Sequence, residues 1–119
     1  MKSSEILAEV KAILKAPWQL NPGRTIPDLD RVGLKGNHGI QIDGTVLYAD
    51  MADSTKLVDT FKSEFAAEVY KSFLLAACRV ICDCGGSITA FDGDRVMAVF
   101  MGDMKNTDAT KCALKINYI

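Results

Sequence analysis

The sequence predicts an α+β domain: the first half of a ferredoxin-like β-α-β-β-α-β unit, preceded by an N-terminal helix. Three observations support this fold class. A β-branched and aromatic run at 45–48 is followed by helical patterns. An Asp-Gly pair at 92–93 separates two apolar runs, which predicts a β-hairpin. Helical spacing returns from Thr107. The order strand, helix, hairpin and helix is that of the first half of the unit, and we expect its second half to be absent from this chain or much reduced.

Composition limits the function classes that need to be considered. The chain has 119 residues, 49% of them hydrophobic, which suits one domain with a real core. Its net charge of -1, without clustered Lys or Arg, predicts neither nucleic-acid binding nor an anionic membrane partner. No apolar run approaches the roughly 20 residues that cross a bilayer, and the opening at 1–5 does not resemble a secretory signal. We expect a soluble, cytoplasmic protein.

Four cysteines raise the question of a metal site. Only Cys82 and Cys84 are close in sequence, and the single His38 lies far from them. A structural zinc site usually needs four ligands in paired spacing. Reduced thiols that serve as small apolar side chains are therefore the favoured interpretation.

The N-terminal segment predicts a helix followed by a connector. Residues Ser3 to Lys15 carry an apolar stripe at helical spacing, which Pro17 ends. A helix of this length is marginal alone, so we expect it to dock on the domain or on a partner subunit. Residues 18–43 are rich in Pro and Gly and predict an irregular connector. The expected organisation is an N-terminal helix and connector at 1–43, then the functional domain at 44–119.

Within 44–119, the first strand leads into two helices. A short helix at 54–61 begins after Asp53 or Ser54, either of which suits an N-cap. A longer helix runs from Ser63 to Asp83 and ends before a glycine pair. Its apolar stripe is expected to face the sheet as core, and consists of Phe65, Val69, Phe73, Ala76 and Val80, widened by Ala66, Ala77 and Ile81.

The hairpin and the last helix complete the predicted elements. Strands at 87–91 and 95–100 are joined by the Asp-Gly pair, with alternating side chains along the second strand. The sheet is expected to be covered on at least one face and mostly dry on the other. The final helix has no capping Gly or Pro before Ile119, so we expect the domain to be truncated at its C-terminus.

Two aspartates stand at the ends of predicted strands. Asp50 ends the first strand and faces a helix start, and Asp94 lies at the hairpin tip. If strand and hairpin are neighbours in one sheet, both carboxylates project from the same edge, which suits hard divalent cations and the phosphates they bind. Taken singly, each aspartate is better explained as a helix cap or a turn residue. Together with the apolar pattern around them, they favour a metal site.

These motifs resemble those of the class III nucleotidyl cyclases over roughly 44–119. In that family an aromatic-x-Asp-apolar strand end, followed by a Thr, is paired with a Gly-Asp hairpin tip before an apolar strand ending in Phe. The matching positions here are Tyr48-Ala49-Asp50-Met51 with Thr55, and Gly93-Asp94 with Met97 and Phe100. Tyr48 is expected to pack beneath the site.

The resemblance implies a two-metal mechanism. Asp50 and Asp94 would be the catalytic residues and, with the backbone carbonyl of Met51, would hold two divalent cations, Mn²⁺ or Mg²⁺. Backbone N–H groups after the strand would bind the β- and γ-phosphates, from Ala52, Asp53, Ser54 and Thr55. Asp53 is otherwise an N-cap. The transition-state Asn and Arg of the family lie in its second half, outside these 119 residues.

The base-reading position departs from the purine enzymes. They often carry a Lys four residues before the second metal aspartate, where this chain has Ala90. Arg95 is either a solvent-facing strand residue or a contact to base or phosphate. The run 91–100 and the residues after it resemble most the pyrimidine cyclases of bacterial Pycsar anti-phage systems.

That closer resemblance implies a homodimeric enzyme that forms 3′,5′-cyclic UMP from UTP, with CTP as second choice. Its product would activate a separate cyclic-nucleotide effector. Three alternatives stay open: an adenylate or guanylate cyclase, a cyclase-like nucleotide-binding module without activity, and an assembly domain that dimerises through the first helix.

Overall fold

A computed structural model describes residues 2–33 and 36–119. The chain divides into two compact units, Met1–Ile42 and Asp43–Ile119. The structure confirms the α+β class, and the second unit has the predicted order of strand, helices, hairpin and helix.

The first unit begins with helix α1 (Ser3–Lys15), which has the predicted bounds and buries none of its residues. Its apolar stripe is exposed along its length, with Leu14 79% exposed. The side-chain amide of Asn37 donates to the carbonyl oxygens of Ile13 and Ala16, at 2.9 and 2.7 Å. It thereby satisfies two carbonyls at the helix end that have no partner within the helix.

The prediction of an irregular connector at 18–43 is wrong. This segment contains strand β1 (Gln19–Pro22), the short helix α2 (Leu29–Val32) and strand β2 (His38–Gln41). The two strands pair in parallel, from Gln19 opposite His38 to Pro22 opposite Gln41. Four-residue strands that include Pro and Gly carry too little alternation for sequence periodicity to reveal them, and only their pairing defines them.

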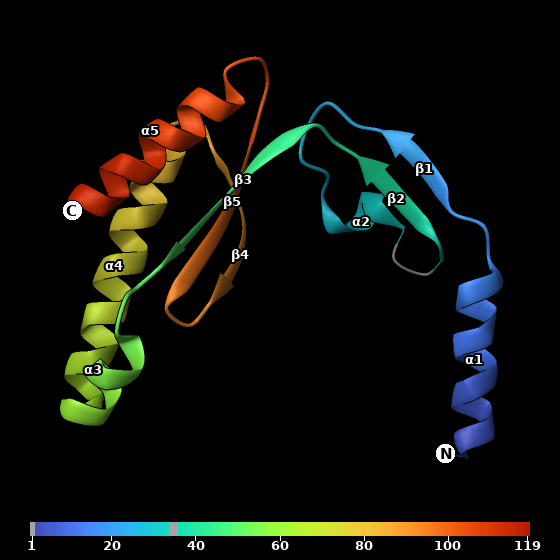
Figure 1. The fold of residues 1–119 in the computed structure, drawn as a ribbon, viewed down its shortest axis with the longest axis horizontal. Coiled ribbons are helices and arrows are strands. Elements are labelled where there is room, and N and C mark those ends of the chain that lie inside the picture. The colour runs from blue at the N-terminus through green and yellow to red at the C-terminus, as the bar shows by residue number, and fades with distance from the viewer. Residues whose placement is uncertain (1, 34–35) are drawn as a thin grey trace. The chain divides into compact units, whose positions relative to one another are not determined.

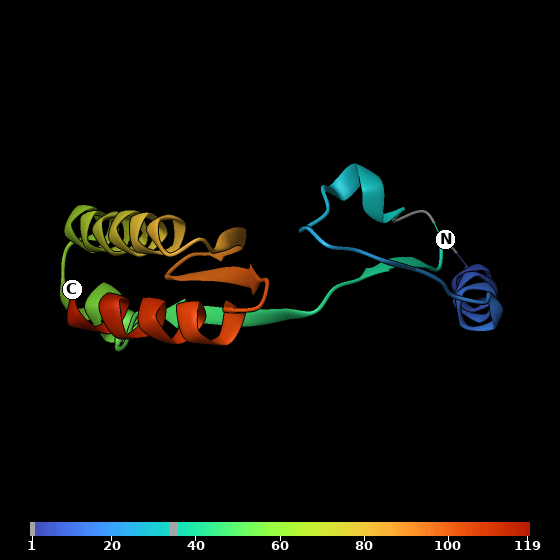
Figure 2. The same ribbon diagram turned by 90° about the horizontal axis from the view of Figure 1, so that it is seen from above.

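The second unit contains β3 (Gly44–Asp50), α3 (Ser54–Thr60), α4 (Ser63–Asp83), β4 (Ser87–Asp92), β5 (Arg95–Met101) and α5 (Lys105–Tyr118). Its sheet has the order β3-β5-β4, and both pairs are antiparallel. Helix α4 contacts β4 and β5, α5 contacts β3 and β5, and the two helices contact each other, so both cover one face of the sheet (Figure 1). Figure 2 shows the same two helices from above, α4 in yellow and α5 in red.

The core lies between this face and the two helices. Along β5, Val96, Ala98 and Phe100 point toward the helices and are almost completely buried, as their alternation predicts. They pack with Leu47 and Ala49 of β3 and with residues of both helices: Ala77, Ile81, Ala109 and Cys112. The core therefore holds β3 against β5, and with it the strand end that carries Asp50.

Two glycines end α4 as predicted. The N–H of Gly85, at φ +81°, donates to the carbonyl of Cys82, and the N–H of Gly86 donates to the carbonyl of Ile81. This pair of bonds is the Schellman arrangement, in which the left-handed position suits glycine. A Cβ on Gly86 would lie 2.6 Å from the ring of Phe100, so the close approach of the turn to the core also requires glycine there.

The other face of the sheet is mostly open in the described chain, although Val99 of β5 is buried on it. Val46 and Tyr48 alternate with the buried residues of β3 and are each 56% exposed. The expectation that Tyr48 packs beneath the site is therefore wrong, because the two-residue period of the strand turns it away from the helices. It stands opposite Met97 of β5 on the open face.

Candidate active site

The register of the sheet brings the two predicted aspartates together. Asp50 is the last residue of β3 and stands opposite Arg95, the first residue of β5. The N–H of Met51 donates to the carbonyl oxygen of Asp94 at 3.1 Å, so the pairing continues one step past the strand end. Both carboxylates therefore belong to one edge of the sheet, as predicted.

The hairpin turn is shifted by one residue from the predicted one. Asp92 still belongs to β4 and pairs with Arg95, so the two loop residues are Gly93 and Asp94. Gly93 has φ +60°, as expected when glycine is the first residue of a two-residue loop. The shift leaves Asp94 at the hairpin tip, next to the end of β3.

The Asp94 carboxylate is held by several neighbours and its side chain is only 19% exposed. Its pKa lies below the ordinary value, chiefly because the Ser54 side chain hydrogen-bonds to it. Desolvation opposes this shift, whereas a backbone hydrogen bond and the charge of Arg95 favour it. The Asp50 side chain makes a smaller contribution in the same direction. Carboxylates that share one edge repel each other when both are ionised, and a bound cation relieves that repulsion.

A cleft of about 860 Å³ opens over these groups. Its lining includes the strand end, the start of α3, one residue of α4 and the hairpin tip, namely Asp50, Met51, Ala52, Asp53, Ser54, Thr55, Lys56, Asp59, Tyr70, Gly93, Asp94 and Arg95. Every predicted site residue except Ala90 is among them. Ala90 lies within β4, opposite Met97.

Three side chains of the cleft were not predicted from the sequence. Lys56 and Asp59 lie on α3, one turn apart, and their helical spacing after the Asp-Ser-Thr segment is the signal that points to them. Tyr70 lies on α4, and its hydroxyl donates to the backbone carbonyl of Ser54 at 3.0 Å. No local pattern connects Tyr70 to the loop, because only the packing of α3 on α4 brings them together.

Asp53 has an unusual backbone. It occupies the N-cap position of α3 in the left-handed region, at φ 55° and ψ 25°, and its side chain makes no capping hydrogen bond. The predicted cap bond is therefore absent. Asp tolerates this region better than most residues, at some cost in strain, and such residues often occur at functional sites.

Arg95 lies between two carboxylates at the hairpin. Its Nε is 3.9 Å from Asp92 Oδ2 and 3.9 Å from Asp94 Oδ1, too long for good hydrogen bonds. This buried nitrogen has no hydrogen-bond partner in the part of the chain that the structure describes. Lys105, by contrast, begins α5 and pairs with Asp43 at 3.1 Å. Of these two cations, Arg95 is the one that lines the cleft.

The donor set of the cleft fits hard divalent cations. Two adjacent carboxylates and a nearby backbone carbonyl are oxygen ligands, which Mg²⁺ and Mn²⁺ prefer. Among residues 2–33 and 36–119, no group of three or more His, Cys, Asp or Glu side chains is arranged to hold a metal ion. A cation at this edge would therefore be completed by backbone, water or ligand oxygens.

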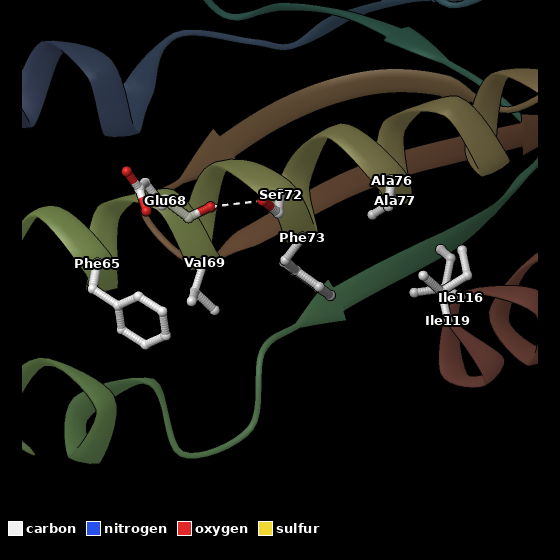
Figure 3. Close-up of a pocket in the computed structure, with 9 residues that line it drawn as sticks. All are labelled: Phe65, Glu68, Val69, Ser72, Phe73, Ala76, Ala77, Ile116 and Ile119. Atoms are coloured by element: carbon white, nitrogen blue, oxygen red, sulfur yellow. Dashed lines mark hydrogen bonds between the residues drawn. The ribbon is translucent and has the colours of Figure 1, made fainter. Parts of the chain in front are cut away.

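A second pocket, of about 470 Å³, lies between α4 and α5 and is mostly apolar (Figure 3). Phe65, Val69 and Phe73 of α4 line it, together with Ile116 and Ile119. The prediction that the whole α4 stripe is sheet-facing core is therefore wrong in part. The buried residues of α4 are Ala66, Ala77 and Ile81, and Phe65 is 47% exposed. The apolar stripe of α4 is wider than the side of the helix that the three-stranded sheet covers.

The chain has relatives among known proteins. The chain is 50% identical over 107 residues to a uridylate cyclase of Xanthomonas perforans, covering 89% of this chain and 46% of that protein. It is 50% identical over 101 residues to a uridylate cyclase of Burkholderia cepacia, covering 84% and 44%. The chain thus spans less than half the length of these relatives. No family model matches it.

The fold has relatives among solved structures. The crystal structure of the adenylyl cyclase CyaB from P. aeruginosa superposes with a TM-score of 0.58 at 22% identity, covering 61% of this chain and 40% of that one. At this identity the likeness shows the fold, which is that of part of a class III cyclase catalytic domain. In the described residues, no helix is both long and apolar enough to cross a membrane.

Proposed function

We propose that this chain, a relative of the uridylate cyclases with part of the class III cyclase fold, belongs to a pyrimidine nucleotide cyclase. The reaction is conversion of UTP, or as second choice CTP, to the 3′,5′-cyclic monophosphate and pyrophosphate. The ribose 3′-oxygen attacks the α-phosphorus, the bond from that phosphorus to the bridging oxygen breaks, and pyrophosphate leaves.

One observation carries this proposal: two carboxylates that are 44 positions apart in the numbering meet at one edge of the sheet in an open cleft. The Met51 to Asp94 backbone bond and the Asp50 to Arg95 register hold them there. The similarity to proteins named uridylate cyclase extends over nearly the whole chain. The site and the similarity therefore point to the same class of enzyme.

Each part of the cleft has a proposed role. Asp50 and Asp94, with the carbonyl of Met51, hold two divalent cations, Mn²⁺ or Mg²⁺. When bound, these ions would lower the pKa of the 3′-hydroxyl and neutralise charge on the triphosphate. Ala52 to Thr55 line the same cleft, and their backbone N–H groups are proposed to contact the β- and γ-phosphates.

Base and anion recognition is proposed for the hairpin. Arg95 lines the cleft, and the N–H donors of its guanidinium suit a phosphate or a base carbonyl oxygen. Ala90 provides no hydrogen-bonding side chain where purine cyclases often use Lys, and this is compatible with a pyrimidine substrate. Ala90 lies outside the cleft lining, so its proposed effect is the space that a small side chain leaves.

Further properties of the whole protein are proposed on the resemblance to Pycsar cyclases. They are a cytoplasmic homodimer, a product that signals to a separate effector, and a role in anti-phage defence. The exposed Val46 and Tyr48 on the open sheet face are consistent with a covering subunit. The net charge of -1 fits a protein without nucleic-acid or membrane partners.

The test is the product spectrum of the complete protein that contains this chain. The protein is incubated separately with UTP, CTP, ATP and GTP in Mn²⁺ or Mg²⁺, and products are identified by chromatography and mass spectrometry. Cyclic UMP or cyclic CMP with pyrophosphate supports the proposal. Cyclic AMP or GMP alone would assign a purine cyclase, and nucleotide binding without any cyclic product would assign an inactive module.

A further inference from the structure

The apolar stripe of helix α1 is uncovered in the part of the chain that the structure describes. The helix buries none of its residues. The stripe is formed by five side chains that are 43–79% exposed, Ile6, Leu7, Val10, Ile13 and Leu14. The two hydrogen bonds from Asn37 reach only backbone carbonyls near the C-terminal end of the helix. A continuous exposed apolar face of this kind is typical of an interaction site.

The charged residues of α1 are sorted by sign along the two edges of this stripe. With a rotation of about 100° per residue, Glu9 lies about 100° to one side of the centre of the stripe, and Lys11 lies about 100° to the other. Glu5 lies on the same side as Glu9, and Lys15 lies on the same side as Lys11. One edge of the stripe is therefore acidic and the other is basic.

This sorting does not stabilise an isolated helix. Glu5 and Glu9 are four residues apart, as are Lys11 and Lys15, and like charges at this spacing repel each other within a helix. Among residues 2–33 and 36–119, the ion pairs of the structure include no side chain of α1. The charges are better satisfied by a partner that presents a basic edge to the acidic one and an acidic edge to the basic one.

A second copy of α1 in parallel orientation presents those edges. A two-fold axis parallel to the helices places the acidic edge of each copy against the basic edge of the other, with Glu9 near Lys11 of the partner subunit. An antiparallel copy would place acidic against acidic and basic against basic. An anionic lipid surface would attract the basic edge and repel the acidic one. The charge pattern therefore selects both the partner and its direction.

We propose that α1 pairs with α1 of a second copy of this chain as a short parallel coiled coil. The pairing buries the apolar stripe and brings Glu9 of each copy next to Lys11 of the other. A helix of 13 residues is too short to pair strongly alone, so the rest of the dimer supplies a high effective concentration. The homodimer is part of the proposed function, and this inference rests on it while adding the surface and its orientation.

Cysteine cross-linking of the complete protein tests the pairing and its direction. In a parallel pair each stripe residue meets its own counterpart, so Ile6→Cys and Ile13→Cys should each form a covalent dimer on oxidation by copper phenanthroline in air. Ala8→Cys, on the opposite side of α1, is the matched control, and all variants carry Cys82→Ala to remove an exposed native thiol. Both stripe variants should cross-link at least about tenfold faster than Ala8→Cys, because pairing raises the effective thiol concentration.

Charge reversal tests the two edges separately from the apolar stripe. In the Ile13→Cys variant, Glu9→Lys places a lysine beside the stripe on both edges, and Lys11→Glu places a glutamate on both. Each single reversal should slow cross-linking about threefold. The double reversal Glu9→Lys/Lys11→Glu exchanges the two edges and should restore the rate of Ile13→Cys, because opposite charges again face each other.

Three results would overturn the inference. The first is cross-linking of the stripe variants no faster than that of Ala8→Cys. The second is cross-linking only in a mixture of Ile6→Cys with Ile13→Cys, which would show an antiparallel pair. The third is a double reversal that stays as slow as the single ones. A protein that is dimeric in solution but does not cross-link would overturn this inference alone, whereas a monomeric protein would also remove the homodimer from the proposed function.

Discussion

The backbone N–H of Met51 donates to the carbonyl oxygen of Asp94, so the loop after β3 and the turn between β4 and β5 form one hydrogen-bonded unit. This bond uses main-chain atoms only. Substitution of the Asp50 or Asp94 side chain therefore leaves intact the backbone bond that joins the two segments.

Asp50→Asn and Asp94→Asn are each expected to abolish turnover while the fold is retained. Each change removes a charged oxygen ligand, and a loss of several kcal/mol at the metal site corresponds to a rate reduction of at least about 100-fold. Asp50 is exposed, and substitutions at exposed positions usually change stability by only about 0.5 kcal/mol. Cyclic nucleotide formation and thermal unfolding, measured on the complete protein, check both parts.

Asp83→Asn is the matched control, because Asp83 is the exposed last residue of α4 and does not line the cleft. It should keep parental turnover. Turnover within about threefold of the parent in either site variant would remove that aspartate from the proposed site.

The sequence predicts those elements in which the apolar period and a helix-breaking residue agree. The stripe of α1 before Pro17 and the stripe of α4 before Gly85 predict helices with the observed bounds. The pair Asp50 and Asp94 is predicted for a different reason, since one follows a β-branched and aromatic run and the other follows the Asp-Gly hairpin signal. The pairing register of two strands is then fixed by which side chains of each strand are buried.

Local sequence patterns do not predict features that depend on contacts between distant elements. Strands β1 and β2 are defined by each other, and Tyr70 reaches the cleft only because α4 packs against α3. The position of Tyr48 is mispredicted for a different reason. The motif that contains it resembles a buried strand end, but the odd and even positions of β3 decide which side chains face the helices.

The left-handed backbone of Asp53 predicts an unusual order of stabilities. Asp53→Gly should be at least as stable as the parent, because glycine adopts φ 55° without strain. Asp53→Val should be less stable by about 1–2 kcal/mol, because a β-branched side chain is strained there. Urea unfolding of the three proteins checks the order.

A glycine substitution at an ordinary helical position shows whether the stability of Asp53→Gly comes from the positive φ of Asp53. Thr55 lies two residues later within α3, where glycine should destabilise by about 1 kcal/mol. If Asp53→Gly is destabilised as much as Thr55→Gly, the left-handed assignment of Asp53 is contradicted.

Cys112 predicts a loss of stability at alkaline pH. Its thiol is completely buried between α5 and the core, and burial, with a smaller contribution from Cys84, raises its pKa from 9.0 to about 12. The folded state therefore holds this proton more tightly than the unfolded state. The stabilisation is fully present below about pH 9, and it is lost as pH rises from about 9 toward 12, by at most about 1.4 kcal/mol per pH unit.

Urea unfolding between pH 7.5 and pH 10.5 measures this loss. Cys112→Ala should be less stable than the parent near pH 7.5 because it leaves a small cavity, but its stability should fall less steeply above pH 9. Cys82→Ala, which removes an exposed thiol from α4, should retain the parental slope. Parallel curves for the parent and Cys112→Ala would mean that another group causes the alkaline loss, because a thiol that resists ionisation only in the folded state must contribute to the difference in slope.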